Sequence, residues 1–511
     1  MGRRRIERED ILMRRFRFVP FLALLAVLAA CMDMDVVNLN QPDAERALAQ
    51  PSDVEALLAT GYYRFWNGTQ KTSPGLSMAL PANELTSSWG NFGMQDLGTQ
   101  PRQAWDNSPT YGYRVAITNA WSNLYQAISN VTDGMVAINQ GLKFIGPAGD
   151  ETPRAHAFAK FTQGIAHGWL AMMYDQAIIF DETLNLEDGV PDPSPYDEVM
   201  AAAIGYLEEA IQVAESNAFQ LPGGDGAWIS ERPLTNTELA QWAHGYLARY
   251  LAAVARTPAV RAQVDWSKVA FHAERAGGSA TVEGDGAFWW FAAGWYPASW
   301  IRAAYDLLGP ADESGGYQAW RAAPLMDRNV FTIETSDRRI HGEGGPTTVG
   351  TYFQRLGSSP FPPARGNYFQ SLYHGIRQQF HKDTGAAGPM PVFYKSEMDL
   401  LRAEARLRAG DIPGAVDLIN ITRVENGQME PLPGSISADE AWKWLKYEKL
   451  VEMSFAISGV PFAERRGWGD LICGTPLHFP IPGGELEQLG LPNYTFGGGV
   501  GGEASPPDCM P

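Results

Sequence analysis

Apolar residues recur at helical spacing between residues 396 and 424, and polar residues fill the positions between them. Met398, Leu401 and Ala405 are three and four residues apart, which places them on one face of a helix. Gly410 suits the left-handed C-cap that ends such a helix, and the aspartate after it suits the N-cap of the next. The pattern predicts two antiparallel helices joined by a short turn.

Helix pairs of this kind are predicted at several places in the chain. They are expected near residues 53–140, 155–214, 238–276 and 395–424. Such tetratricopeptide-type pairs bury their apolar stripe only by stacking on neighbours.

The predicted repeats are not evenly spaced. Three second helices carry a valine at an equivalent place, Val199, Val269 and Val416, separated by 70 and 147 residues. A tandem array would repeat every ~34 residues. The sequence therefore predicts a mainly α-helical scaffold of interrupted hairpins, with loop-rich insertions near 73–113 and 280–390. Insertions of that length in a compact protein are usually functional.

The N-terminus reads as a secretion signal. Arginines precede an apolar run from Phe18 to Ala30, and small residues lie directly before Cys31. This arrangement predicts a lipoprotein signal peptide over residues 1–30, with Cys31 lipidated as the mature N-terminus. A plain signal peptide with a coincidental cysteine is the alternative, and Met1 and Met13 both suit as the start. The apolar run is too short to span a bilayer.

Charge and motifs narrow the classes of function. Residues 1–30 contain seven arginines and three acidic residues, so their removal changes the formal net charge from −18 to −22. A surface this acidic repels phosphate backbones, which argues against nucleic acid as a partner. HExxH, CxxC and G-x-S-x-G are absent, and the glycine run at 497–502 lacks a strand–helix context. We expect no cofactor, no metal and no catalytic residues. The acidic loop at 181–192 lacks EF-hand spacing, and a solvated turn is favoured there over calcium binding.

Two further cysteines remain, Cys473 and Cys509. In an oxidising compartment they can pair and tie the glycine- and proline-rich tail to the preceding residues. The unpaired state stays open, because a mobile tail does not hold the geometry that a disulfide needs.

Five motifs occur in an order that suggests a family. They are Cys31, the run W-S-N-L-Y-Q-A-I at 121–128, the L-R-A-E-A-R-L-R-A-G-D hairpin at 401–411 with L-I-N-x-x-R at 418–423, Y-E-K-L-V-E at 447–452, and F-P-I-P at 479–482 with Glu485. In this order they resemble the SusD-like (RagB/SusD) family of outer-membrane nutrient-binding lipoproteins. Residues 447–470 depart most from the family pattern, which leaves the ligand open.

The resemblance implies a fold and a function. The expected protein is a non-enzymatic lipoprotein, anchored in the outer membrane and exposed on the cell surface. It would capture glycans or other oligomers, an oligosaccharide or a peptide, and deliver them to a TonB-dependent SusC-like β-barrel. Residues 31–511 would form a single SusD-like domain. Its helix pairs would face the barrel and its insertions would carry the ligand.

Aromatic clusters in the two insertions are candidate ligand platforms. The C–H face of a sugar covers an aromatic ring, while neighbouring polar groups meet the hydroxyls. The candidates are Trp89, Asn91 and Phe92 in the first insertion, and Trp289, Trp290, Trp295, Tyr296 and Trp300 in the second. For each ring the alternative is packing against the helices.

Two other classes of function stay open. Aspartate and glutamate are plentiful, so a carboxylate pair for glycoside hydrolysis is available to a secreted helical enzyme. A tetratricopeptide adaptor that binds only protein is the third candidate, and it predicts no affinity for a soluble oligomer.

Overall fold

The computed structural model describes residues 50–87, 90–147, 149–184, 189–229, 231–285, 301–358, 371–385 and 387–496. These residues belong to one compact unit, Leu48–Pro511. The predicted signal peptide and Cys31 lie outside the described residues. No helix within the described ranges combines the length and the apolar character that a bilayer span requires.

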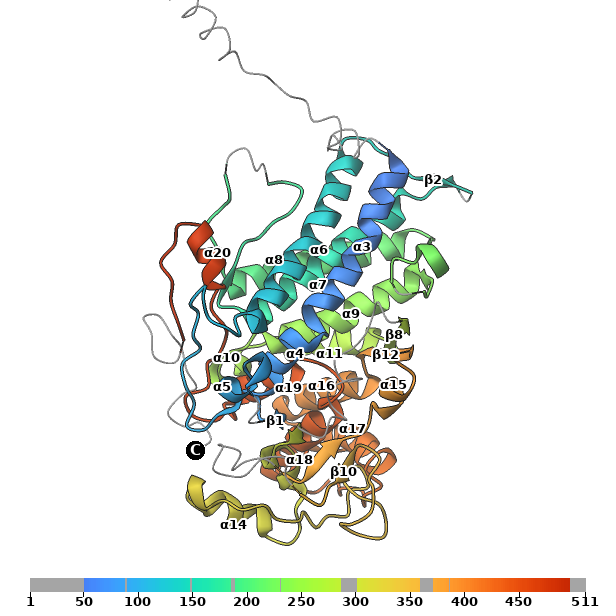
Figure 1. Cartoon of the computed structure of the whole chain (residues 1–511). Coiled ribbons are helices and arrows are strands. Elements are labelled where there is room, and N and C mark those ends of the chain that lie inside the picture. Colours follow the sequence, from blue (N-terminus) through green and yellow to red (C-terminus); the bar gives the residue numbers. More distant parts are fainter. Residues whose placement is uncertain are drawn as a thin grey trace, which may run out of the picture. The chain divides into compact units, whose positions relative to one another are not determined.

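Helices dominate this unit (Figure 1). The long ones are α3 (Pro51–Thr69), α6 (Val115–Asn139), α7 (Thr152–Met173), α8 (Tyr196–Ser216), α9 (Asn236–Ala253), α11 (Trp266–Arg275), α16 (Lys395–Arg408), α17 (Ile412–Glu425) and α18 (Ala438–Met453). Each packs on the next one in this list. The predicted mainly α-helical hairpin scaffold is confirmed.

Shorter elements connect the long helices or belong to the insertions. The short helices are α4 (Thr72–Ala79), α5 (Met94–Gly98), α10 (Pro258–Ala262), α13 (Tyr305–Leu308), α14 (Gly316–Ala322), α15 (Gln379–Asp383), α19 (Val460–Trp468) and α20 (Gly483–Gln488). The strands form two-stranded antiparallel sheets: β1 (Leu85–Thr86) with β9 (Arg302–Ala303), β2 (Ile145–Gly146) with β3 (Gly149–Asp150), β4 (Gln176–Ala177) with β5 (Ser194–Pro195), β6 (Gln220–Leu221) with β7 (Leu234–Thr235), β8 (Ala280–Asp285) with β12 (Ala387–Phe393), and β10 (Phe353–Arg355) with β11 (Tyr373–Gly375).

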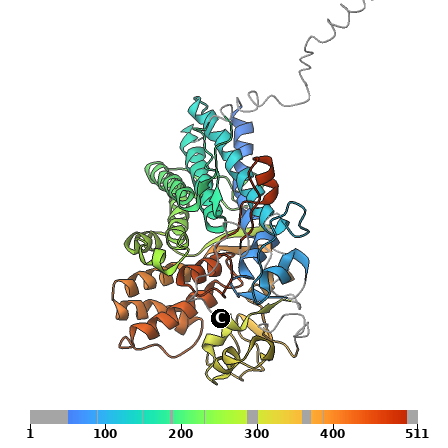
Figure 2. The same cartoon turned by 90° about the vertical axis from the view of Figure 1, so that its left-hand side faces the viewer.

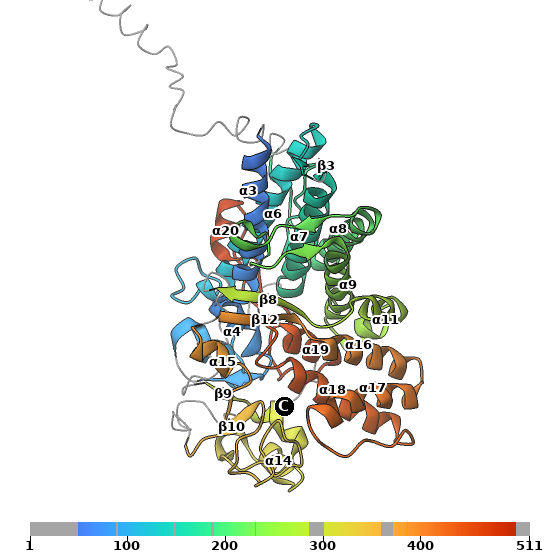
Figure 3. The same ribbon diagram turned by 90° about the vertical axis from the view of Figure 1, so that its right-hand side faces the viewer.

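The β8–β12 pair explains the uneven repeat spacing. It joins the two ends of the second insertion, so the chain leaves and re-enters the helical stack at one place (Figure 3). Helices α11 and α16 therefore pack directly on each other although residues 276–394 separate them. The helices of residues 395–453, orange in Figure 2, continue the stack of the green helices.

Side-chain caps define where several helices begin. Thr235 and Glu238 form a reciprocal capping box at α9. Asp265 accepts a hydrogen bond from the backbone N–H of Lys268 at the start of α11. Asp411 caps α17 in the same way, directly after a glycine with φ of 80°. The predicted turn between α16 and α17 is thus confirmed.

Helix α7 lies at the centre of the core. Its residues from 157 to 173 are all buried, and glycines let neighbouring helices approach it closely. A methyl group at Gly168 would lie 2.1 Å from the ring of Tyr250 on α9, so only glycine fits there. Its buried polar side chains have partners: Lys160 donates to Glu182, Gln163 donates to Thr132, and the His167 ring contacts a backbone carbonyl oxygen.

A buried cluster of charges joins four helices on one side of α18. Lys449 of α18 lies 2.9 Å from Glu404 of α16 and 2.9 Å from Glu464 of α19. Arg261, directly after Val260 in α10, contacts the same two carboxylates at 2.7 and 2.5 Å. These side chains are at most 6% exposed, so no water competes with the ion pairs.

A second buried cluster attaches the insertion to α18. Arg339 lies 2.7 Å from Asp337, 2.7 Å from Glu448 and 2.9 Å from Glu452, with every side chain fully buried. Burial raises the pKa of Glu448, and Arg339 opposes that shift. The Y-E-K-L-V-E motif therefore supplies charges to both clusters, since Glu448, Lys449 and Glu452 belong to it.

His167 of α7 is held in its neutral form. One ring nitrogen, Nδ1, lies 2.8 Å from the carbonyl oxygen of Gln163, and the other, Nε2, accepts a hydrogen bond from the backbone N–H of Phe180. Nε2 would have to lose that bond on protonation. Burial lowers the pKa of His167 to about 4, well below the ordinary histidine value.

We therefore expect His167 to destabilise the fold in mild acid. The unfolded chain takes up the proton near pH 6.5 and the folded chain only near 4, so stability is present above pH 6.5 and is lost as the pH falls towards 4. Urea titrations at pH 7 and 4.5 measure the loss. The wild type should lose roughly 2 kcal/mol more than His167→Gln, which has no ring to protonate. An identical loss in both proteins would show that His167 is not held neutral.

Candidate ligand-binding site

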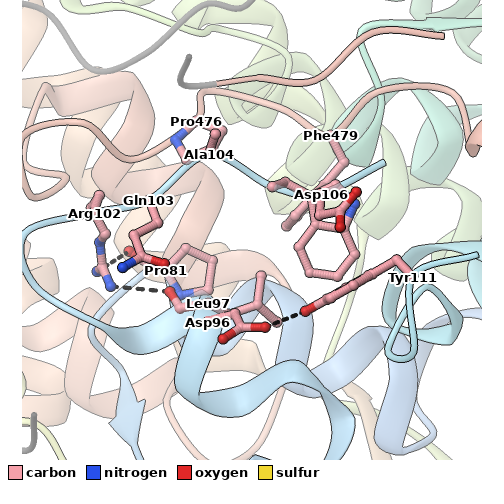
Figure 4. Close-up of a pocket in the computed structure, with 11 residues that line it drawn as sticks. Pro81, Asp96, Leu97, Arg102, Gln103, Ala104, Asp106, Tyr111, Pro476 and Phe479 are labelled. Carbon is pink, nitrogen blue, oxygen red and sulfur yellow. Dashed lines mark hydrogen bonds between the residues drawn. The ribbon is translucent and has the colours of Figure 1, made fainter. Parts of the chain in front are cut away.

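A cavity of about 220 Å³ opens in the first predicted insertion (Figure 4). Nine of its lining residues fall between Pro81 and Tyr111, and Pro476 and Phe479 close it from the C-terminal part of the chain. The sequence indicated the first segment as a functional insertion. It gave no sign that the F-P-I-P motif would form the opposite wall.

Arg102 holds the cavity's backbone in place. All five of its N–H groups donate to the protein. The acceptors are the carbonyl oxygens of Pro81, Leu97 and Thr99 and the side-chain oxygens of Asn83 and Thr475. Burial lowers the pKa of Arg102 to about 10, so it stays charged at neutral pH. One side chain thus connects three segments of the chain.

Aromatic rings form one wall of the cavity. Trp105 is 4% exposed and meets Tyr111 edge to face, with ring centroids 5.2 Å apart at 87°. Phe479 meets Trp105 in the same way at 5.9 Å and 85°. Within the described residues, the indole N–H of Trp105 has no hydrogen-bond partner. This wall offers ring edges and C–H groups to an apolar ligand face.

Polar side chains form the rim. Asp96, Gln103 and Asp106 are exposed and line the cavity. The hydroxyl of Tyr111 donates to Asp96, and burial together with this carboxylate raises the pKa of Tyr111. Asp106 accepts a hydrogen bond of 2.8 Å from the backbone N–H of Ser108, which shapes the local turn. Gln103 presents an uncharged amide.

Asn107 fastens the insertion to the C-terminal segment. Its Nδ2 contacts the carbonyl oxygens of Ile481 and Tyr494 at 2.9 and 3.0 Å, and its Oδ1 accepts from the N–H of Gly483 at 3.1 Å. A methyl group at Gly483 would lie 2.0 Å from the carbonyl oxygen of Asn107, so the close approach requires glycine. Asn107 looks like any loop asparagine in the sequence and could not be singled out.

Two of the sequence motifs contact each other through Trp121 and Glu485. Phe479 pairs with the end of α7, because its N–H donates to Met173 and its carbonyl accepts from Asp175. Trp121 of the W-S-N-L-Y run hydrogen-bonds Glu485, whose pKa is raised by burial and lowered by that bond. Of these motif residues, Phe479 lines the cavity, whereas Trp121 and Glu485 do not.

Two residues of the first predicted platform, Asn91 and Phe92, are described by the structure. Asn91 begins the 3-10 helix η1 (Asn91–Gly93) and is exposed, whereas Phe92 is partly buried against the core. A methyl group at Gly93 would lie 3.7 Å from the Trp105 ring and 3.4 Å from Tyr113. Asn91 and Phe92 thus come directly before a glycine that lies near the Trp105 ring of the cavity wall. Their contact with a ligand stays a prediction.

Other predicted site residues lie outside the described residues. They are Trp89, Trp289, Trp290, Trp295, Tyr296 and Trp300. Cys473 is disulfide-bonded. Because Cys509 also lies outside, its pairing with Cys473 stays a prediction. In the described part of the chain, no group of three or more histidine, cysteine, aspartate or glutamate residues could hold a metal ion.

Comparison with solved structures identifies the fold. A SusD superfamily protein from Bacteroides vulgatus superposes with a TM-score of 0.53 and 14% identity, covering 83% of this chain and 89% of the other. A SusD-like carbohydrate binding protein from Bacteroides fragilis gives 0.55 and 14%, with 83% and 87% covered. A SusD superfamily protein from Bacteroides fragilis gives 0.52 and 15%, with 82% and 90% covered.

These likenesses confirm the resemblance inferred from the motifs, and what they establish is the SusD-like fold. No family model matches the chain, and no curated protein matches its sequence. At this distance in sequence, the function rests on the site.

Proposed function

We propose that this protein is a carbohydrate-binding subunit that captures glycans at the cavity between residues 81–111 and Phe479. The observation that carries the proposal is the aromatic wall of Trp105, Tyr111 and Phe479 beside a polar rim. Sugar recognition needs both features, because a pyranose has an apolar face and an edge of hydroxyls. The carbohydrate-binding protein that shares the fold supports this choice.

The cavity walls are preorganised for binding. Arg102 and Asn107 hold the insertion to the C-terminal segment through hydrogen bonds to Thr475, Ile481 and Tyr494. A rigid site loses less conformational entropy when a ligand binds. The predicted platforms around Trp89 and at 289–300 would extend the contact to further sugar units.

The finer proposal concerns location and delivery. We infer that Cys31 is lipidated and anchors the protein in the outer membrane, exposed on the cell surface. The bound oligomer would then pass to a TonB-dependent SusC-like β-barrel. The motif order and the SusD-like fold support this assignment.

A glycoside hydrolase is the rival function, because two carboxylates, Asp96 and Asp106, line the cavity. Such enzymes require a pair of carboxylic acids on either side of the scissile bond. A binding protein retains an oligosaccharide without product, whereas a hydrolase releases shorter sugars.

Gln103→Ala tests the cavity. Loss of one hydrogen bond should weaken glycan affinity about fivefold without changing stability. Affinity electrophoresis against neutral polysaccharides, followed by isothermal titration with oligosaccharides from those retained, gives the measurement. Gln140→Ala removes another exposed amide, directly after α6 and outside the cavity, and is the matched control. Equal affinity of both variants and the wild type would exclude this cavity, and released product would favour the hydrolase.

Cys31→Ser tests the anchor. The variant lacks the thiol that accepts lipid and should move from the membrane fraction to the soluble fraction. Mass spectrometry of the mature N-terminal peptide should find an acylated Cys31 in the wild type. A wild-type protein that starts elsewhere, or an unmodified Cys31 in membranes, contradicts the assignment.

A further inference from the structure

Three lining residues of the cavity carry a formal charge: Asp96, Arg102 and Asp106. Their net effect on a ligand depends on which of them can reach it. An arginine that faces the opening would attract acidic sugars. Two unneutralised carboxylates would repel them.

Arg102 cannot reach the ligand with a free donor. A guanidinium has five N–H groups. Each of them already donates to a protein oxygen, at distances between 2.6 and 3.3 Å. A ligand carboxylate would have to displace one of these bonds, and the displaced acceptor would then lose its partner. Arg102 therefore acts as part of the wall.

The two aspartates each keep an oxygen available. Asp96 accepts the Tyr111 hydroxyl on Oδ2, and Asp106 accepts the Ser108 N–H on Oδ1. The other oxygens, Oδ1 of Asp96 and Oδ2 of Asp106, have no partner among the residues that the structure describes. Neither aspartate forms an ion pair there, and both are exposed. Figure 4 shows the hydrogen bond between Asp96 and Tyr111.

Because the cavity is small, the charges of both Asp96 and Asp106 should affect a bound ligand. Asp96 and Asp106 both line a cavity of only about 220 Å³, so we expect a sugar ring bound there to lie near both carboxylates. Opposite charges a few ångström apart attract in a partly enclosed site, where water screens them less than in bulk. The chain's net charge of −18 adds a long-range term of the same sign.

Resting on the proposed function, we propose that the cavity selects sugars by charge: an amino sugar with a free ammonium group binds best, a neutral sugar less well, and a uronic acid worst. The ammonium group would lie against the open oxygens of Asp96 and Asp106. Gln103 and the aromatic wall would contact the rest of the ring in all three cases. The selection adds to the binding of neutral glycans and does not replace it.

Three β-1,4-linked hexasaccharides with the same backbone test this order at pH 6: the glucosamine hexamer, cellohexaose and the cellouronate hexamer. Isothermal titration should give at least a tenfold tighter Kd for the glucosamine hexamer than for cellohexaose, and the weakest binding for cellouronate. In 1 M NaCl the differences should shrink to about twofold, because salt screens exposed charges.

Variants assign the effect to the cavity. Asp106→Asn keeps the acceptor for Ser108 but removes the charge, and together with Asp96→Asn it should bring the three affinities within about twofold of one another. Asp225→Asn removes one exposed charge outside the cavity and should leave the order unchanged.

The outcomes separate this inference from the function on which it rests. If a neutral polysaccharide is bound through Gln103 but the three hexasaccharides bind equally or not at all, charge selection is wrong and the binding site stands. Tighter binding of cellouronate, or an order that survives loss of both aspartates, also overturns the inference. If no glycan is bound at all, the proposed function itself is wrong.

Discussion

Burial of two charge clusters on one helix is the constraint on which this structure depends. Helix α18 presents Lys449 to Glu404 and Glu464, and it presents Glu448 and Glu452 to Arg339. Removing one partner from such a cluster leaves an uncompensated charge away from water, which is far more costly than losing a surface ion pair. The hairpin α16–α17, helix α19 and the insertion that contains Arg339 are thereby held to a single element.

The cavity proposed to bind glycans is also held together by polar contacts between segments that are distant in the sequence. Arg102 and Asn107 fasten the first insertion to the F-P-I-P segment, and that segment is fastened in turn to the end of α7. The packed helices hold the ends of the loops in place, and the loops contribute most of the side chains that line the cavity. Apart from Asp96 and Leu97 on α5, most side chains that line the cavity come from irregular backbone that packed helices fix in place.

How far the sequence could predict this structure depends on how local each signal was. Gly410 and Asp411 act within one turn of chain, and the predicted hairpin there is confirmed. The insertion was predicted from the uneven valine spacing, but its closure by β8 and β12 was not, because short strands have little periodicity. The sequence also did not identify Arg102 and Phe479 as residues of the cavity, because their contacts with each other's segment are not local. Thr475 is 373 residues from Arg102, and Trp105 is about as far from Phe479 along the chain, so nothing at either position indicates which distant segment it meets.

The free energy of unfolding of Lys449→Met tests the central role of α18 most directly. Glu404 and Glu464 lose a buried cation in this variant, and urea titration should show a loss of about 3 kcal/mol relative to the wild type. Lys268→Met, the same substitution in the exposed pair with Glu208, should lose less than about 1 kcal/mol. An equally small loss in both variants would contradict the account, since the buried cluster would then contribute no more than a surface ion pair.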